Sequence, residues 1–87
     1  MRESTIEKAV SKFAVSVGWI TYKFTSPQHR GVPDRIFIRD SVVMFVEFKA
    51  PGELPTVLQA HTHEIMKNHG AVVHVVDSVE QGKVLLC

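Results

Sequence analysis

The hydrophobic pattern at the start of the chain predicts an amphipathic helix. Apolar side chains recur every three or four positions, at Ile6, Ala9, Val10, Phe13, Ala14 and Val17. This spacing places them on one face of an α-helix, and Gly18 follows as a typical C-terminal stop. Ser4 and Glu7 have the spacing of a capping box at the N-terminus of this helix. We therefore predict a helix over residues 4–17.

The next three ordered segments have the composition of β-strands. Residues 19–24 are rich in aromatic and β-branched side chains, which favour extended backbone. Residues 35–39 form a second strand, and a tight turn at Asp40 and Ser41 connects it to a third over residues 42–49. The third segment is apolar on both faces until its last residues, which is typical of a central strand.

A second helix is predicted after a loop that contains two prolines and a glycine. It spans residues 56–69 and ends at Gly70. Leu58, Ile65 and Met66 are expected to face inward from it.

The end of the chain predicts one more strand and one more helix. Residues 71–76 are continuously apolar, and Ser78 with Gln81 could form another capping box at the start of a short helix. The element order is αβββαβ with a short C-terminal helix, which indicates an α/β protein with a mixed sheet flanked by helices. We expect a single domain over residues 1–87.

Composition is typical of a small soluble globular protein. Hydrophobic residues make up 45% of the chain and charged residues 22%. No apolar run approaches the roughly 18 residues that a membrane-spanning helix needs. Cys87 is the only cysteine, so no internal disulfide can form. An intracellular, cytoplasmic setting is expected, which would be the host cytoplasm for a viral protein.

Charge is distributed unevenly along the chain. Residues 1–49 carry eight Lys and Arg against five Asp and Glu, a net +3, whereas residues 50–87 carry two against four, a net −2. Differences of this size are common. If bound cations neutralise acidic residues of the first half, however, that half presents a positive field to a polyanion.

The motif with most chemical content joins a Pro-Asp turn to a Glu-Phe-Lys strand end. Asp34 precedes the second predicted strand, and Glu47 and Lys49 close the third. Residues two apart in a strand project from one face, so Glu47 and Lys49 point to one place, and the hairpin brings Asp34 beside them. Carboxylate oxygens suit Mg²⁺ or Mn²⁺, and a lysine can orient water and steady negative charge on a phosphate.

Each part of this motif also has an ordinary structural explanation. Pro-Asp is a common turn element, and a Glu-x-Lys at a strand end is usually a solvated edge. The combination favours a functional site, because a strand this apolar has little reason to place two charges on one face unless they meet a ligand.

On these motifs the chain resembles the stand-alone form of the VRR-NUC family, within the PD-(D/E)xK nuclease superfamily. The resemblance rests on the element order, on Gly31-Val32-Pro33-Asp34-Arg35, on Phe45-Val46-Glu47-Phe48-Lys49-Ala50-Pro51-Gly52 and on Gln59. It extends from Glu3 to about Glu80. It implies a restriction-endonuclease-like core and a metal-dependent phosphodiesterase that acts on DNA.

The resemblance also implies roles for individual residues. Asp34 and Glu47 would be metal ligands, joined by the backbone carbonyl of Phe48, and Lys49 would be catalytic. The glutamine of the family matches Gln59, and its helix-borne glutamate best matches Glu7.

The last two assignments compete with simpler explanations. Glu7 could merely close the capping box with Ser4, and Glu3 is a nearby rival. We favour Glu7 as the site residue, reaching the metal through water. Gln59 could be an ordinary surface residue, but the family match favours an amide that hydrogen-bonds Lys49 or the DNA backbone.

Basic and polar residues near Asp34 are candidates for DNA contact. Arg30 and Arg35 flank the acid and suit bidentate phosphate contact, while Gly31 allows the backbone to approach DNA. The remaining candidates are Ser26, Gln28 and His29 in the same loop, and Lys8, Lys12 and Lys23 as a flanking phosphate track. Exposed loop arginines are commonplace, so these assignments depend on the neighbouring site.

Histidines raise the alternative of a zinc site. His61 and His63 are two apart and do not share a helix face, and no other His or Cys completes a tetrahedral spacing. A structural zinc is therefore not expected. His74, in an apolar strand, is interpreted as a core or interface residue.

Two classes of function fit this chain. One is an endonuclease with Mg²⁺ or Mn²⁺ held by Asp34 and Glu47; the other is a catalytically silent DNA-binding or assembly module with the same fold. The endonuclease is favoured because every acidic and basic position that the chemistry needs is filled.

We further expect selectivity for branched DNA and a homodimer. The predicted core uses all 87 residues, which leaves no appended domain for reading base sequence. A two-fold dimer would match the symmetry of a four-way (Holliday) junction and would bury apolar surface that a small core leaves over. Candidate interface residues are Trp19, Met44, His74 and Val84-Leu85-Leu86.

Overall fold

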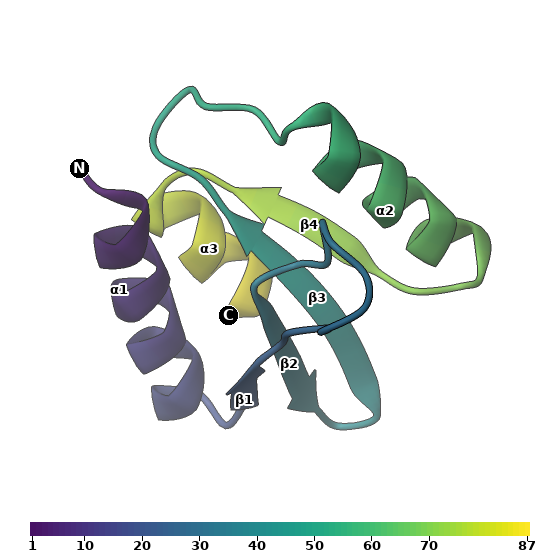
Figure 1. The fold of residues 1–87 in the computed structure, drawn as a ribbon. Helices are drawn as coiled ribbons and strands as arrows, with labels where there is room; N and C mark the ends of the chain where they lie inside the picture. Colours follow the sequence, from purple (N-terminus) through teal and green to yellow (C-terminus); the bar gives the residue numbers. More distant parts are fainter.

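The computed structural model describes residues 1–87 as a four-stranded sheet with helices on both faces (Figure 1). The elements are α1 (Glu3–Ser16), β1 (Ile20–Lys23), β2 (Arg35–Arg39), β3 (Val42–Phe48), α2 (Val57–Asn68), β4 (Val73–Val76) and α3 (Val79–Leu86). This arrangement confirms the predicted α/β class and element order, and the ends of each element lie within two residues of their predicted positions. None of the helices has the length and apolarity needed to cross a membrane.

The third strand is central, as predicted. The sheet order is β1-β2-β3-β4, with β1, β2 and β3 antiparallel and β4 parallel to β3. The β2–β3 turn places Asp40 and Ser41 at φ +50° and +69°, the left-handed conformation that a two-residue hairpin loop favours. Register sets Glu47 beside Val75 of β4, one residue beyond the last β2–β3 pair of Arg35 and Val46, so this acid lies buried on the central strand rather than on a solvated edge.

Alternation along β3 separates the hydrophobic core from a polar face. Val46 and Phe48 point to the face covered by α1 and α3, whereas Glu47 points to the opposite face, toward α2. The core on the first face consists of Ile6, Val10, Ala14, Trp19, Phe37, Met44, Val46, Phe48, Val76 and Leu86. Glu47 therefore faces α2 from a strand whose opposite face is tightly packed in the hydrophobic core.

Two predicted caps differ in detail from the structure. Helix α1 begins at Glu3 after Arg2, without a side-chain cap, so the predicted capping box of Ser4 and Glu7 is wrong. Helix α3 has half of its predicted box, because Ser78 accepts from the Gln81 amide while the Gln81 side chain accepts from the residue before the cap.

The capping box that does form completely begins α2. Thr56 Oγ1 accepts from the backbone N–H of Gln59, and Gln59 Oε1 accepts from the N–H of Thr56. This box fixes the Gln59 side chain at the end of α2 that lies nearest the predicted site.

Two predictions about apolar surfaces are wrong. Leu58 and Ile65 of α2 are each 47% exposed, and the buried residue of this helix is His63. Trp19 and Met44 are buried in the core instead of forming a dimer surface.

The reason is clearest at Trp19. Its ring packs edge-on against Phe37, and its Nε1 donates to the Leu86 carbonyl at 2.7 Å, which also draws the C-terminal helix onto the core. Of the C-terminal apolar residues, Leu86 is fully buried and Val84 is 76% exposed.

Candidate metal centre

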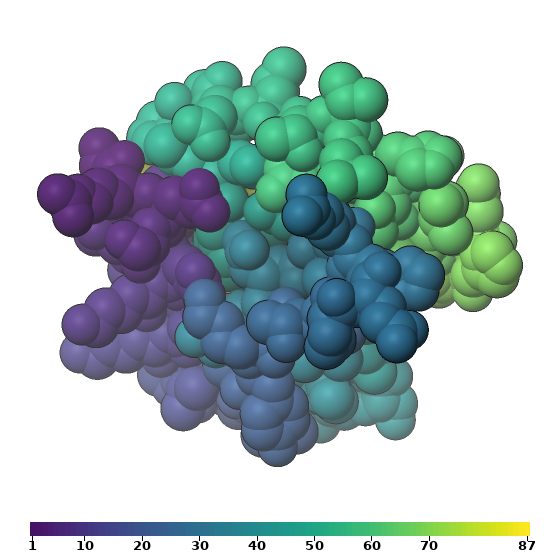
Figure 2. All heavy atoms as spheres, in the orientation of Figure 1, coloured from purple at the N-terminus to yellow at the C-terminus, as the bar shows by residue number.

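Three carboxylates from separate parts of the chain converge at one end of the sheet. Glu3 lies in the first turn of α1, Asp34 immediately precedes β2, and Glu47 lies near the end of β3. Each offers an oxygen within 4.8 Å of the others, a spacing that one divalent cation can bridge. Figure 2 shows the sheet surface, in teal and blue, recessed between the purple start of α1 and the loop and helix that lie on its other side.

A glycine positions the loop that delivers Asp34. Gly31 has φ +84°, and a Cβ atom there would lie 2.8 Å from Thr62 Oγ1 and 2.9 Å from the Leu58 carbonyl oxygen. Only a residue without a side chain allows the loop to pack this closely on α2. The neighbouring carbonyl of Arg30 accepts a 2.9 Å hydrogen bond from Thr62, which holds the two segments together.

Backbone hydrogen bonds then orient Asp34. Its Oδ2 accepts from the N–H of Phe48 at 2.8 Å, and its own carbonyl accepts from the N–H of Phe24. Asp34 is therefore tied directly to the last residue of β3, between Glu47 and Lys49, as the sequence predicted.

Glu47 is the electrostatic centre of the site. It is 1% exposed, and its Oε1 has no hydrogen-bond partner. Burial, followed by the negative charge of Asp34, raises the Glu47 pKa to about 8, although the positive charge of Lys49 opposes the shift. Burial and the Asp34 charge also raise the pKa of Glu3. A bound divalent cation would relieve both the repulsion and the unpartnered oxygen, so these residues fit a metal.

Lys49 lies with the carboxylates, as expected. It is 6% exposed, an unusual degree of burial for a lysine, and its Nζ is 3.9 Å from Glu53 Oε1. Its charge acts on both Glu47 and Glu3. An ammonium with one loose partner remains available to hydrogen-bond a water or a phosphate oxygen.

Helix α2 contributes two side chains that contact Glu47. Gln59 Nε2 lies 3.4 Å from Glu47 Oε2, so its amide faces the carboxylate rather than Lys49. His63, one helical turn later, is 4% exposed and places Nε2 3.5 Å from Glu47 Oε1. Burial lowers the His63 pKa, which favours the neutral imidazole.

His63 is the residue that sequence reasoning missed. The sequence pattern draws attention to it only as a zinc partner of His61, which is exposed. Its spacing of four from Gln59 is the signal that places His63 on the same helix face as Gln59.

The helix-borne acid of the cluster is Glu3 rather than Glu7. Glu7 lies one turn further along α1, where its Oε2 pairs with Lys23 and accepts from Arg35 Nε at 2.8 Å. Lys23 and Arg35 are register partners on β1 and β2, so both bases meet Glu7 on the core-facing side of the sheet. This geometry does not support the sequence-based preference for Glu7.

Candidate DNA-contact residues divide into free and engaged groups. Arg30, His29 and Gln28 are exposed on the loop before β2, and Ser26 is half-buried there. Lys8 and Lys12 are exposed on α1. Lys23 and Arg35 are paired with Glu7, which makes them less available to a phosphate.

Known proteins are similar to this chain in sequence and in fold. The chain is 42% identical over 86 residues to "Putative nuclease p44" of Acyrthosiphon pisum secondary endosymbiont phage 1, covering 98% of this chain and 92% of that protein. A solved structure described as "VRR_NUC domain" superimposes with a TM-score of 0.87 at 28% identity, covering 95% of this chain and 91% of the other. No family model matches the chain. Overall sequence identity, shared fold and full-length coverage agree, and the chain belongs to the VRR-NUC family of nucleases.

Proposed function

We propose that this nuclease is a Mg²⁺- or Mn²⁺-dependent endonuclease that cleaves phosphodiester bonds in DNA. The observation that carries the proposal is the unpartnered, buried Oε1 of Glu47, which lies in a cluster of three carboxylates beside a buried lysine. Hard oxygen ligands of this kind suit Mg²⁺ and Mn²⁺ better than zinc.

The carboxylates and the lysine of the cluster have different proposed roles. Asp34 and Glu47 would hold the cation with the backbone carbonyl of Phe48, and Glu3 would complete the acidic set, directly or through water. The cation supplies Lewis-acid activation of the phosphate and a more acidic water. Lys49 donates to the attacking water or to a phosphate oxygen and stabilises negative charge there.

Two side chains of α2 position the central carboxylate. Gln59 contacts Oε2 of Glu47 and His63 faces Oε1, so the orientation of the carboxylate is restricted from both oxygens. Carboxylate ligands that are fixed in this way lose less conformational freedom when they bind a cation.

The loop before β2 is the proposed approach path for DNA. Arg30 and His29 are exposed on the loop that leads to Asp34, whereas the side of Gly31 that lacks a side chain packs against α2 and does not face a phosphate. Lys8 and Lys12 extend the positive surface along α1.

A homodimer that nicks branched DNA, four-way junctions in particular, is the finer part of this proposal. The dimer surface differs from the one expected from sequence. Ile20 and Tyr22 of β1 are 51% and 60% exposed, and Ile20, Ile38 and Val43 are cross-strand neighbours on the face that carries Glu47. This apolar sheet surface is left open beyond α2, and two-fold pairing of such surfaces is the commonest way to cover them.

Cleavage of a panel of linear, flap and four-way-junction DNAs tests the proposal. We expect nicking with Mg²⁺ or Mn²⁺, none in EDTA, and faster nicking of the junction than of linear duplex. Lys49→Ala should lose cleavage but keep DNA binding. DNA binding by the wild type without cleavage in either metal would instead support the silent binding module.

A further inference from the structure

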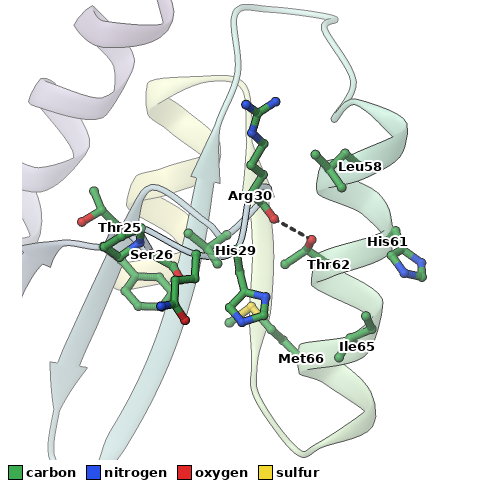
Figure 3. Close-up of a pocket in the computed structure, with 13 residues that line it drawn as sticks. Thr25, Ser26, His29, Arg30, Leu58, His61, Thr62, Ile65 and Met66 are labelled. Carbon is green, nitrogen blue, oxygen red and sulfur yellow. Dashed lines mark hydrogen bonds between the residues drawn. The ribbon is translucent and has the colours of Figure 1, made fainter.

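A groove lies between the loop before β2 and helix α2. Its volume is about 640 Å³, within the roughly 300–1,000 Å³ range of small-molecule sites. Figure 3 shows the loop on one side and α2 on the other, with Leu58, Thr62 and Met66 directed toward the loop. Phe24 also lines the groove, and its ring is held against Phe45 with centroids 5.2 Å apart.

The lining combines several apolar side chains with one charged base, Arg30. The apolar side chains include Phe24, Leu58, Ile65 and Met66, and Arg30 lines the groove together with two histidines. No Asp or Glu is among the lining residues. This combination suits a flat, largely apolar group attached to a negative charge, because the apolar part is buried while the charge meets Arg30.

The groove shares a wall with the metal centre. A Cβ on Gly31 would lie 3.2 Å from Gln59 Cα, and Gln59 in turn reaches Glu47 through Nε2 at 3.4 Å. The carbonyl of Arg30 is bonded to Thr62 on the same wall. Gly31 of the loop and Gln59 of α2 therefore lie between the groove and the carboxylates.

We propose that this groove binds the base of an unpaired nucleotide next to the scissile phosphate. The proposal rests on the endonuclease function and deepens it by naming the substrate feature that is recognised. A base stacked inside a duplex cannot enter, whereas a base at a branch or bulge is already unstacked and enters at low cost. Aromatic and apolar contacts with the base would add affinity without requiring a particular sequence.

Replacing one nucleobase tests this directly. Two labelled duplexes are compared, one with a single bulged adenine and one with an abasic analogue at the same position, and binding is measured by fluorescence anisotropy in EDTA. We expect the wild type to bind the adenine bulge about fivefold or more tightly than the abasic bulge, the lower end of the range for one stacked base.

Ile65→Trp should fill the groove from a half-exposed position and remove this difference. The matched control is Val84→Trp, which adds the same side chain to an exposed site on α3 outside the groove and should keep the wild-type ratio. Equal wild-type binding to both DNAs would overturn the proposal even if Ile65→Trp failed to fold. A wild-type ratio in folded Ile65→Trp would also overturn it.

Metal-dependent cleavage is measured separately on the wild type. If the wild type binds the adenine and abasic bulges equally but still cleaves DNA, only the base-binding groove is refuted. If it prefers the adenine bulge but does not cleave in Mg²⁺ or Mn²⁺, the endonuclease proposal is refuted and the base-binding groove is supported.

Discussion

At the residue scale, one turn of α1 decides which glutamate joins the carboxylate cluster. Glu3 lies with Asp34 and Glu47, whereas Glu7 is neutralised by Lys23 and Arg35. We predict that Glu3→Gln lowers metal-dependent cleavage roughly 10- to 100-fold, the usual effect of losing a supporting group at a metal site. Glu7→Gln should leave Mn²⁺ affinity close to the wild-type value. Cleavage rates and Mn²⁺ titrations of both variants measure this, and a greater loss in Glu7→Gln would contradict the assignment.

The ionisation of Glu47 gives a second prediction. Its pKa rises from the ordinary 4.5 to about 8 in the metal-free fold, so the folded protein holds a proton that the unfolded chain has released between these values. The contribution of Glu47 to the free energy of unfolding is therefore complete at low pH and is lost as pH rises through about 8. The contribution of His63 to the free energy of unfolding has the opposite pH dependence, because burial lowers its pKa. That contribution is complete above the ordinary pKa of 6.5 and is lost as pH falls below it.

Comparison with Glu47→Gln isolates this effect. In EDTA, the Tm of the wild type should fall relative to the Tm of Glu47→Gln as pH rises toward 8. Added Mn²⁺ should stabilise the wild type more at pH 8 than at pH 6, because fewer protons compete with the cation for the Glu47 carboxylate at the higher pH. A pH-independent difference would show that Glu47 is not protonated in the metal-free fold.

At the scale of elements, the packing of the loop on α2 sets the position of Asp34. Gly31→Ala should destabilise the protein by about 1–3 kcal/mol, because it adds positive-φ strain and collides with Thr62 and the Leu58 carbonyl. Cleavage should fall with it as Asp34 moves. Gly70→Ala is the matched control, since φ is +93° there but no atom lies within 4 Å of the added Cβ. Thermal unfolding of both variants should show the larger loss for Gly31→Ala.

The elements and the core of the site were predictable from the sequence for a local reason. Asp34, Glu47 and Lys49 are brought together by one hairpin and by alternation along one strand, which spacing alone determines. The family resemblance instead favoured Glu7 as the helix-borne acid, but α1 begins at Glu3 and brings that residue to Asp34 and Glu47.

The roles on α2 could not be obtained from hydrophobic periodicity. This helix turns His63 inward because it faces a carboxylate-bearing sheet surface, and Leu58 and Ile65 line an open groove. Tertiary contacts of polar groups outweigh the expectation that apolar residues face the core.

At the scale of the whole molecule, the open apolar sheet surface predicts self-association. Tyr22→Glu should convert the proposed homodimer into a monomer, because an isolated charge would be desolvated in the interface. Val84→Glu places the same charge on a site that is 76% exposed on α3 and should remain dimeric. Sedimentation at micromolar concentration distinguishes the two, and a monomeric wild type would exclude this dimer.

The central claim is that one acidic cluster holds the catalytic cation, and calorimetric titration of Mn²⁺ tests it most directly. The wild type and Lys49→Ala should both bind Mn²⁺, since the lysine is not a ligand. Asp34→Asn and Glu47→Gln should fold but lose this binding, because each removes a carboxylate oxygen from the cluster. Wild-type Mn²⁺ affinity in either carboxylate variant would contradict the account.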